Sequence, residues 1–165
     1  MKKLVIIGAN DFQNQLILKA KSLGYETHVF AWEEGAVGKS TADYFYPISI
    51  VEKEEILDKC KQIKPDGVCS IASDLASITV NYVAENLGLP CNKMKYSAIQ
   101  TNKYKMREAF MAAGLPCPKF VLADENFDES QVKDFKFPII VKPTDRSGSR
   151  NIMKLESTDG LLKAI

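Results

Sequence analysis

A lysine at the end of an apolar strand is the first feature of this sequence that could do chemistry. Lys142 is the last residue of the predicted strand Phe137–Lys142, where an ammonium group is costly to bury without an anionic partner. Ser147, Gly148 and Ser149 follow, and such small residues let backbone N–H groups approach phosphate oxygens. The segment fits a loop over the phosphates of a nucleotide. It fits equally well an ordinary hairpin with a polar loop and a lysine whose stem lies along the strand.

A second lysine, Lys103, lies at the start of a predicted helix. It belongs to the run TNKYKMREAFMAAGLPCPKF, which spans Thr101–Phe120 and ends in a Gly-Leu-Pro-x-Pro element. Together the two segments resemble the ATP-grasp superfamily. Its pattern is T-[DN]-K, a helix, G-[LI]-P-x-P, a strand, and [IV]-[IV]-K-P followed by a Ser/Gly-rich loop. The SGSR form of the loop is most similar to the carbamoyl-phosphate-synthase-like members.

The resemblance implies a role for each of these residues. It places Lys103 and Lys142 on the phosphates of ATP and folds Ser147, Gly148 and Ser149 over them. It implies that the protein uses ATP and Mg²⁺. It also implies a ligase that phosphorylates a small carboxylate and passes the acyl phosphate to an amine or similar nucleophile. Such chemistry depends on positioning the reactants and neutralising their charge.

The resemblance also implies that part of the site is missing. In the family the Mg²⁺-binding Glu and Asn, the adenine-binding hinge and a catalytic Arg come from a later subdomain, and this sequence ends before them. We therefore expect no catalytic residue and no metal ligand in the chain. We expect an N-terminal fragment of such a ligase, inactive by itself.

Strand and helix patterns alternate through the first half of the chain. Crossovers between parallel strands need about a dozen residues, so this order predicts an α/β fold with an open parallel sheet flanked by helices. The resemblance identifies residues 1–92 as a Rossmann-like pre-ATP-grasp domain. The expected strands are Lys3–Ile7, Thr27–Trp32, Asp43–Ile50 and Gly67–Ala72, and the expected helices are Asp11–Leu23, Val51–Ile63 and Leu75–Leu87.

The second half has a different pattern, with a domain boundary near Pro90–Ser97. The resemblance identifies residues 93–165 as a partial α+β ATP-grasp subdomain, truncated at its C-terminus. The last predicted helix stops without the glycine, proline or polar tail that normally ends a helix. The expected helices are Met94–Gln100, Asn102–Ala113, Ser130–Phe135 and Thr158–Ile165, and the expected strands are Lys119–Ala123, Phe137–Lys142 and Ile152–Leu155.

Polar residues after two of the predicted strands are candidate substrate contacts. Open α/β sheets bind ligands at the carboxyl ends of their strands, where Asn10 and Asp74 would lie. The alternative is structural: Gly8 permits a tight turn, and Asp74 caps a helix that begins at Leu75, which is the favoured interpretation for Asp74. Neither GxGxxG nor GxxxxGK[ST] is present, which disfavours a dinucleotide-binding dehydrogenase and a Walker-type phosphate loop.

Composition excludes several classes of function. The 165 residues include 22 Lys and Arg against 21 Asp and Glu, a net charge of +1, without the basic excess of a nucleic-acid binder. No apolar run approaches the roughly 20 residues that span a bilayer, and we expect a cytoplasmic protein without a membrane partner.

Cysteine and histidine usage points away from a metal site. The four cysteines are scattered, and the single histidine, His28, lies within a predicted strand. Zinc ligands usually come in close pairs, so we expect free, buried thiols, Cys69 in particular.

A second hypothesis stays open beside the ligase, namely a non-catalytic nucleotide- or metabolite-binding module or a dimerisation module. A homodimer is an expected partner in either case.

Overall fold

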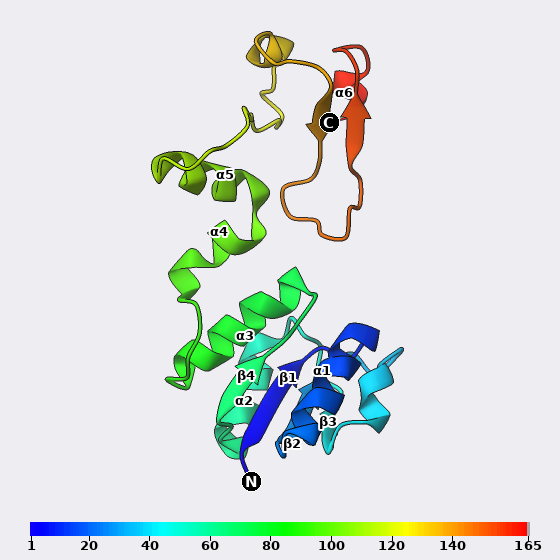
Figure 1. Cartoon of the computed structure of the whole chain (residues 1–165), viewed down its shortest axis with the longest axis vertical. Helices are drawn as coiled ribbons and strands as arrows, with labels where there is room; N and C mark the ends of the chain where they lie inside the picture. Colours follow the sequence, from blue (N-terminus) through cyan, green and yellow to red (C-terminus); the bar gives the residue numbers. More distant parts are fainter. Residues whose placement is uncertain (165) are drawn as a thin grey trace. The chain divides into compact units, whose positions relative to one another are not determined.

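The chain folds into two compact units. The computed structural model describes residues 1–164 and divides at α4 (Ser97–Thr101), with one unit over Met1–Ser97 and the other from Ala98 onward (Figure 1). The first unit holds a four-stranded sheet with helices on its faces, and the second holds a two-stranded sheet with short helices.

The four-stranded sheet has the order β3-β2-β1-β4, and every neighbouring pair is parallel. The register pairs Lys3 with Glu26 and Ile7 with Phe30, so the carboxyl ends of the two central strands lie together. The predicted α/β fold with an open parallel sheet is confirmed. The strands are β1 (Lys3–Ile7), β2 (Glu26–Phe30), β3 (Tyr44–Tyr46) and β4 (Gly67–Cys69).

The helices cover both faces of this sheet. Side chains of a strand point alternately to opposite faces, and β1 accordingly sends Val5 and Ile7 into one apolar cluster and Ile6 into the other. The Val5 cluster includes residues of α2 (Lys53–Ile63) and α3 (Asp74–Asn86), while the Ile6 cluster includes residues of α1 (Asp11–Ser22). Two short 3-10 helices complete the unit, η1 (Val37–Ser40) and η2 (Met94–Tyr96).

The apolar residues of the helices are not all buried. On α2 Ile56, Leu57, Cys60 and Ile63 are buried. On α1 the buried face consists of Gln13, Ile17 and Ala20. Phe12, which is 65% exposed, and Leu23, which is 62% exposed, lie to one side of this face.

The second unit is built from six short elements. Its strands pair antiparallel, with Ile139 opposite Leu155 and Val141 opposite Met153, and the loop between them carries the predicted phosphate-contacting residues. The elements are α4, α5 (Lys103–Ala112), η3 (Glu129–Val132), β5 (Ile139–Val141), β6 (Met153–Leu155) and α6 (Leu161–Ala164).

Two predictions for this unit need correction or restriction. The expected strand Lys119–Ala123 is wrong, since that segment pairs with no strand among residues 1–164. β-branched and aromatic residues favour a strand only where a neighbouring strand is available. The expected last helix Thr158–Ile165 is shorter and begins at Leu161, and its final residue lies outside the described residues. Within residues 1–164, no helix is long and apolar enough to cross a membrane.

Asp43 gives the first unit a pH-dependent contribution to stability. Its carboxylate lies 2.8 Å from Lys21 Nζ and accepts hydrogen bonds from the backbone N–H of Thr27 at 2.9 Å and from its hydroxyl at 2.8 Å. The Lys21 hydrogen bond first, and the Thr27 N–H second, lower the pKa of Asp43 from 3.8 to about 2.

We therefore expect the free energy of unfolding to fall as Asp43 is protonated. The native-state pKa is depressed, so its contribution is complete above about pH 4 and is lost as the pH falls through about 2. The side chain remains 32% exposed, and solvent screening reduces the expected loss to about 1–2 kcal/mol. Urea unfolding at a series of pH values measures it. Asp43→Asn should remove this part of the acid dependence; an identical slope in the variant would contradict the assignment.

Candidate functional site

Lys103 and the loop after β5 are brought together in the second unit. Asn102 caps α5 by accepting the N–H of Lys105 at 3.0 Å, which places Lys103 in the first turn. The backbone N–H of Lys103 donates to the carbonyl of Thr144 at 2.8 Å. Its ammonium donates to the carbonyl of Arg146. Two segments about forty residues apart thus meet at the N-terminus of α5, since Lys103 and Arg146 are separated by 43 positions in the sequence.

The loop has an irregular backbone shape. Gly148, Ser149 and Asn151 all adopt left-handed conformations, with φ of 69°, 56° and 54°. Non-glycine residues rarely adopt this conformation. Among residues 1–164, the N–H groups of Ser147, Gly148 and Ser149 form no hydrogen bond with protein, which leaves them available to an acceptor from outside the chain.

Lys142 follows β5 directly and is exposed. Its ammonium has neither an ion pair nor a hydrogen bond with any described residue, unlike the ammonium of Lys103. Residues 142–150 also carry Arg146 and Arg150 against the single acid Asp145, three positive charges against one negative. Arg146 Nε lies 3.9 Å from Asp145 Oδ1. The segment therefore presents a net positive charge with free N–H donors, which suits an anion.

A separate pocket lies at the carboxyl edge of the parallel sheet in the first unit. Its volume is about 210 Å³, and residues that follow β1, β2 and β3 contribute to its wall. Ligands of open α/β sheets bind at this edge. The lining residues are Gly8, Ala9, Asn10, Gln13, Ala31, Trp32, Glu34, Gly35, Ala36, Ser49, Ile50 and Ser73.

The two candidate substrate residues at this edge differ in position. Asn10 lines the pocket, but its Oδ1 is occupied as the N-cap of α1, where it accepts the N–H groups of Phe12 at 2.9 Å and Gln13 at 3.3 Å. Asp74 does not line the pocket and is the first residue of α3. The N-cap is Ser73, which has an extended backbone and whose Oγ accepts the N–H of Ala76 at 3.2 Å. The prediction that Asp74 caps the helix was therefore wrong by one residue.

Gln13 is the residue at this edge that the sequence prediction missed. Its side chain is 1% exposed, its Oε1 accepts the N–H of Asn10 at 3.1 Å, and its Nε2 donates to the carbonyl of Ile71 at 2.5 Å. It thereby joins the turn after β1 to the turn after β4. The signal was available, because Asn-x-x-Gln at positions 10–13 is a capping-box pattern.

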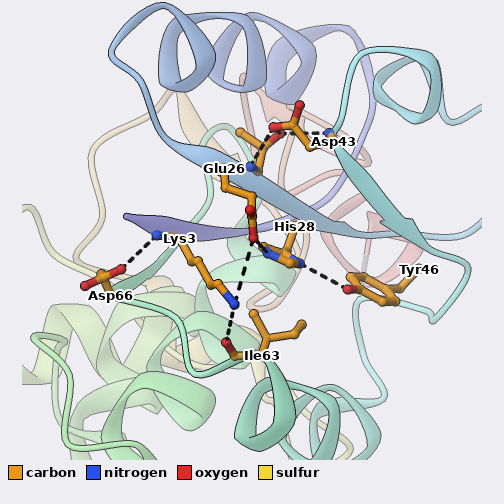
Figure 2. A network of polar contacts seen from close by, with 8 residues as sticks. Lys3, Glu26, His28, Asp43, Tyr46, Ile63 and Asp66 are labelled. Carbon is orange, nitrogen blue, oxygen red and sulfur yellow. Dashed lines mark hydrogen bonds and ion pairs between the residues drawn. The ribbon is translucent and has the colours of Figure 1, made fainter. Parts of the chain in front are cut away.

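His28 belongs to a polar network nearer the amino ends of the strands. Figure 2 shows its ring between Glu26 and Tyr46, with Nε2 2.8 Å from Glu26 Oε1 and Nδ1 3.0 Å from the Tyr46 hydroxyl. The ring also stacks on Tyr44 at 4.7 Å, and Lys3 Nζ lies 3.9 Å from the same Glu26 oxygen. The network connects β1, β2 and β3 and uses both ring nitrogens, so a structural role accounts for all of its contacts.

Two of the thiols have raised pKa values, and no cluster of metal-ligating side chains is found within residues 1–164. Burial raises the pKa of Cys60 to about 12 and that of Cys69 to about 11, so both stay protonated at neutral pH. Cys60 is buried, whereas Cys69, Cys91 and Cys117 are only partly buried, and all are free. No group of three or more His, Cys, Asp or Glu side chains placed to hold a metal ion is found within residues 1–164.

Comparison with known proteins extends this description. No protein-family model matches the sequence. Formate-dependent phosphoribosylglycinamide formyltransferase from Prochlorococcus marinus subsp. pastoris is 26% identical over 99% of this chain and 42% of the relative. D-alanine–D-alanine ligase B from Chromobacterium violaceum is 34% identical over 52% of this chain and 29% of the relative. N5-carboxyaminoimidazole synthetase from Staphylococcus aureus, solved in complex with ADP, has a TM-score of 0.81, 15% identity, and coverage of 98% of this chain and 43% of that one.

The fold is thus that of the N-terminal part of this Staphylococcus aureus synthetase, an α/β unit followed by a second unit. The resemblance to the ATP-grasp superfamily that the lysine segments led us to expect is confirmed by these similarities. The chain spans 42% of the length of the formyltransferase that it matches. The finer similarity to carbamoyl-phosphate-synthase-like members stays a prediction.

Proposed function

We propose that this chain supplies the N-terminal α/β unit and part of the ATP-phosphate site of an ATP-dependent carboxylate–amine ligase. The observation that carries the proposal is the meeting of Lys103 with the loop after Lys142. The relationship to ATP-grasp enzymes supports it. By itself the chain is inactive in this proposal, because the family resemblance implies that the Mg²⁺ ligands come from a later subdomain.

The residues present fit a polyphosphate but not a metal ion. In the proposal Lys142 and Lys103 neutralise phosphate oxygens, and the free N–H groups of Ser147, Gly148 and Ser149 donate to them. ATP supplies the phosphoryl group that activates the carboxylate. The chain's own contribution is to hold the phosphates by charge and hydrogen bonding, which are the main catalytic terms in phosphoryl transfer.

The pocket at the sheet edge is the proposed contact for the small substrate. Asn10 remains a candidate through its Nδ2, because its Oδ1 is already occupied by the helix cap. Asp74 is a weaker candidate, since the pocket is lined by its neighbour Ser73 instead. Glu34 and Trp32 also line the pocket, and a carboxylate beside an aromatic ring suits a ligand that carries an amine.

Nucleotide binding by the isolated chain tests the phosphate site. Calorimetry with ADP should detect binding to the wild type, and Lys142→Met should weaken it by about 10–100-fold, the effect of losing one charge-assisted contact. Lys136→Met is the matched control, because Lys136 is an exposed lysine shortly before β5. Equal losses in the two variants, or none, would remove Lys142 from the site.

Turnover and oligomeric state test the rest of the proposal. We expect the isolated chain to release no ADP from ATP and Mg²⁺ with any carboxylate, and robust turnover would refute its proposed incompleteness. Binding of NADH in place of ADP would favour a metabolite-binding module. Sedimentation measures the homodimer, which stays a proposal, as does the cytoplasmic location.

A further inference from the structure

The pocket at the sheet edge holds a carboxylate without a cation. Among residues 1–164, Glu34 is the only charged residue in its lining, and the carboxylate has neither an ion pair nor a hydrogen bond. The preceding residue differs, since Lys39 Nζ lies 2.6 Å from Glu33 Oε1, and this hydrogen bond lowers the pKa of Glu33. Lys39 is thus already paired. A cationic ligand would find at Glu34 an anion that the protein leaves unneutralised.

Four backbone N–H groups of the turn after β1 already have acceptors. Turns at the start of a helix bind phosphate through free N–H groups, but here the N–H of Gly8 donates to Phe30 O at 2.8 Å. The N–H of Asn10 donates to Gln13 Oε1 at 3.1 Å. The N–H groups of Phe12 and Gln13 both donate to Asn10 Oδ1, at 2.9 and 3.3 Å. The helix cap therefore uses the donors that a phosphate would need.

The shape of the turn keeps these acceptors in place. Gly8 has a φ of 100°, and a Cβ there would lie 3.0 Å from Gln13 Cδ, so the glutamine side chain fills the space beside the turn. Gln13 is 1% exposed, and its Nε2 donates to the carbonyl of Ile71. A phosphate would have to displace this buried amide and break its hydrogen bonds, which is costly. The edge therefore disfavours a phosphate where its pocket offers a free carboxylate.

We propose that the pocket binds the ammonium group of a small substrate without a phosphate, with Glu34 as the counter-ion and Trp32 as an aromatic surface beside it. The inference rests on the proposed function, in which the phosphates of ATP bind in the second unit, and it names the class of the small substrate. An ammonium is attracted both to a carboxylate and to the face of an indole ring. The volume of about 210 Å³ is below that of sites for drug-sized ligands.

NMR titration of the isotopically labelled chain with a matched pair of amines tests this. Ethanolamine and O-phosphoethanolamine differ only in the phosphate group. Ethanolamine should shift the backbone N–H signals of Gly35 and Ala36, which line the pocket. O-phosphoethanolamine should bind there about tenfold more weakly, because its phosphate meets the Glu34 carboxylate and no free donor. Each signal belongs to one residue, so a phosphate bound at Ser147–Ser149 is not mistaken for a ligand in the pocket.

Glu34→Gln should weaken ethanolamine binding by about 3–10-fold, the effect of losing one exposed charge-assisted contact, and should reduce the preference over O-phosphoethanolamine. Glu55→Gln is the matched control, because it removes the same charge from an exposed position in the first turn of α2, outside the lining. Equal binding of the two amines would overturn the proposal. So would the absence of a shift with ethanolamine, or equal affinities in the wild type and Glu34→Gln.

Calorimetry with ADP separates this inference from the proposed function. If ADP binds but the pocket shows no preference for ethanolamine, the inference fails and the nucleotide site stands. If the pocket prefers ethanolamine through Glu34 but ADP does not bind, the nucleotide function fails and the amine site stands.

Discussion

Phe30→Ala is expected to lower the free energy of unfolding of the first unit by about 3–5 kcal/mol. Phe30 is fully buried at the carboxyl end of β2 and stacks on Tyr46 at 4.6 Å between ring centres. The alanine leaves a cavity in the α2/α3 face of the sheet, while the backbone carbonyl still accepts the N–H of Gly8. Chemical denaturation monitored by circular dichroism measures the loss. It is a large part of the stability of an ordinary domain, about 5–15 kcal/mol.

Phe12→Ala is the matched control, since the same side chain is removed from an exposed site. The Phe12 ring is 65% exposed, and surface substitutions usually change stability by less than about 0.5 kcal/mol. Similar losses in both variants would show that the Phe12 ring is buried, which would contradict the structure. A small effect of Phe30→Ala would contradict the described core.

Gln13→Leu should destabilise the same unit by about 1–2 kcal/mol, although leucine is the more apolar side chain. The substitution leaves the N–H of Asn10 without its acceptor and the carbonyl of Ile71 without its donor, both in part-buried hydrogen bonds. The turns after β1 and β4 lose their connection, so the pocket at the sheet edge should lose order as well. Gln15→Leu is the control, because Gln15 is exposed on the same helix.

Gln13→Glu separates the two hydrogen bonds by pH. A carboxylate at position 13 still accepts from Asn10 but has no proton to donate to the Ile71 carbonyl, whereas the protonated acid can do both. Folding therefore raises the pKa of the introduced carboxyl group. Stability relative to the wild type should then be best at low pH and should fall as the pH rises through that pKa. A pH-independent difference would place Gln13 outside the Ile71 contact.

The sheet was predictable from the sequence because its strands are short apolar runs, and the segments between them carry apolar residues at helical spacing. Lys3–Ile7 matches β1 residue for residue, and the strand-helix alternation permits parallel connections. The edge strand Tyr44–Tyr46 also falls within its expected segment. Each of these strands is indicated by its local sequence pattern, and in the structure each pairs with a neighbouring parallel strand.

The failures have a common physical cause, since each depended on a partner that local sequence does not specify. The segment Lys119–Ala123 has strand-forming residues but no neighbouring strand. Gln13 was overlooked because a polar residue on an apolar face becomes stable only when both ends of its amide find partners, and one of these, Ile71, lies 58 positions away.

The residues of the candidate phosphate site could be predicted from the sequence, but the hydrogen bonds that they form without a ligand could not. The sequence places Lys103 and Lys142 in two motifs, and the family resemblance assigns both to the same ligand. Only the structure distinguishes them, by the carbonyl that faces Lys103. A hydrogen bond to a loop backbone leaves no signal in residue identity, because any residue at position 146 would offer the same carbonyl.

The pocket at the sheet edge is lined by a tryptophan whose fluorescence can report on binding. Trp32 is the single tryptophan of the chain, is 67% exposed and lines the pocket. Selective excitation of the indole therefore observes this one location in an otherwise silent protein. A small molecule that displaces water from Trp32 would shift the emission to shorter wavelength, so a collection of amines and carboxylates can be screened for binding to this pocket without a label or a coupled enzyme.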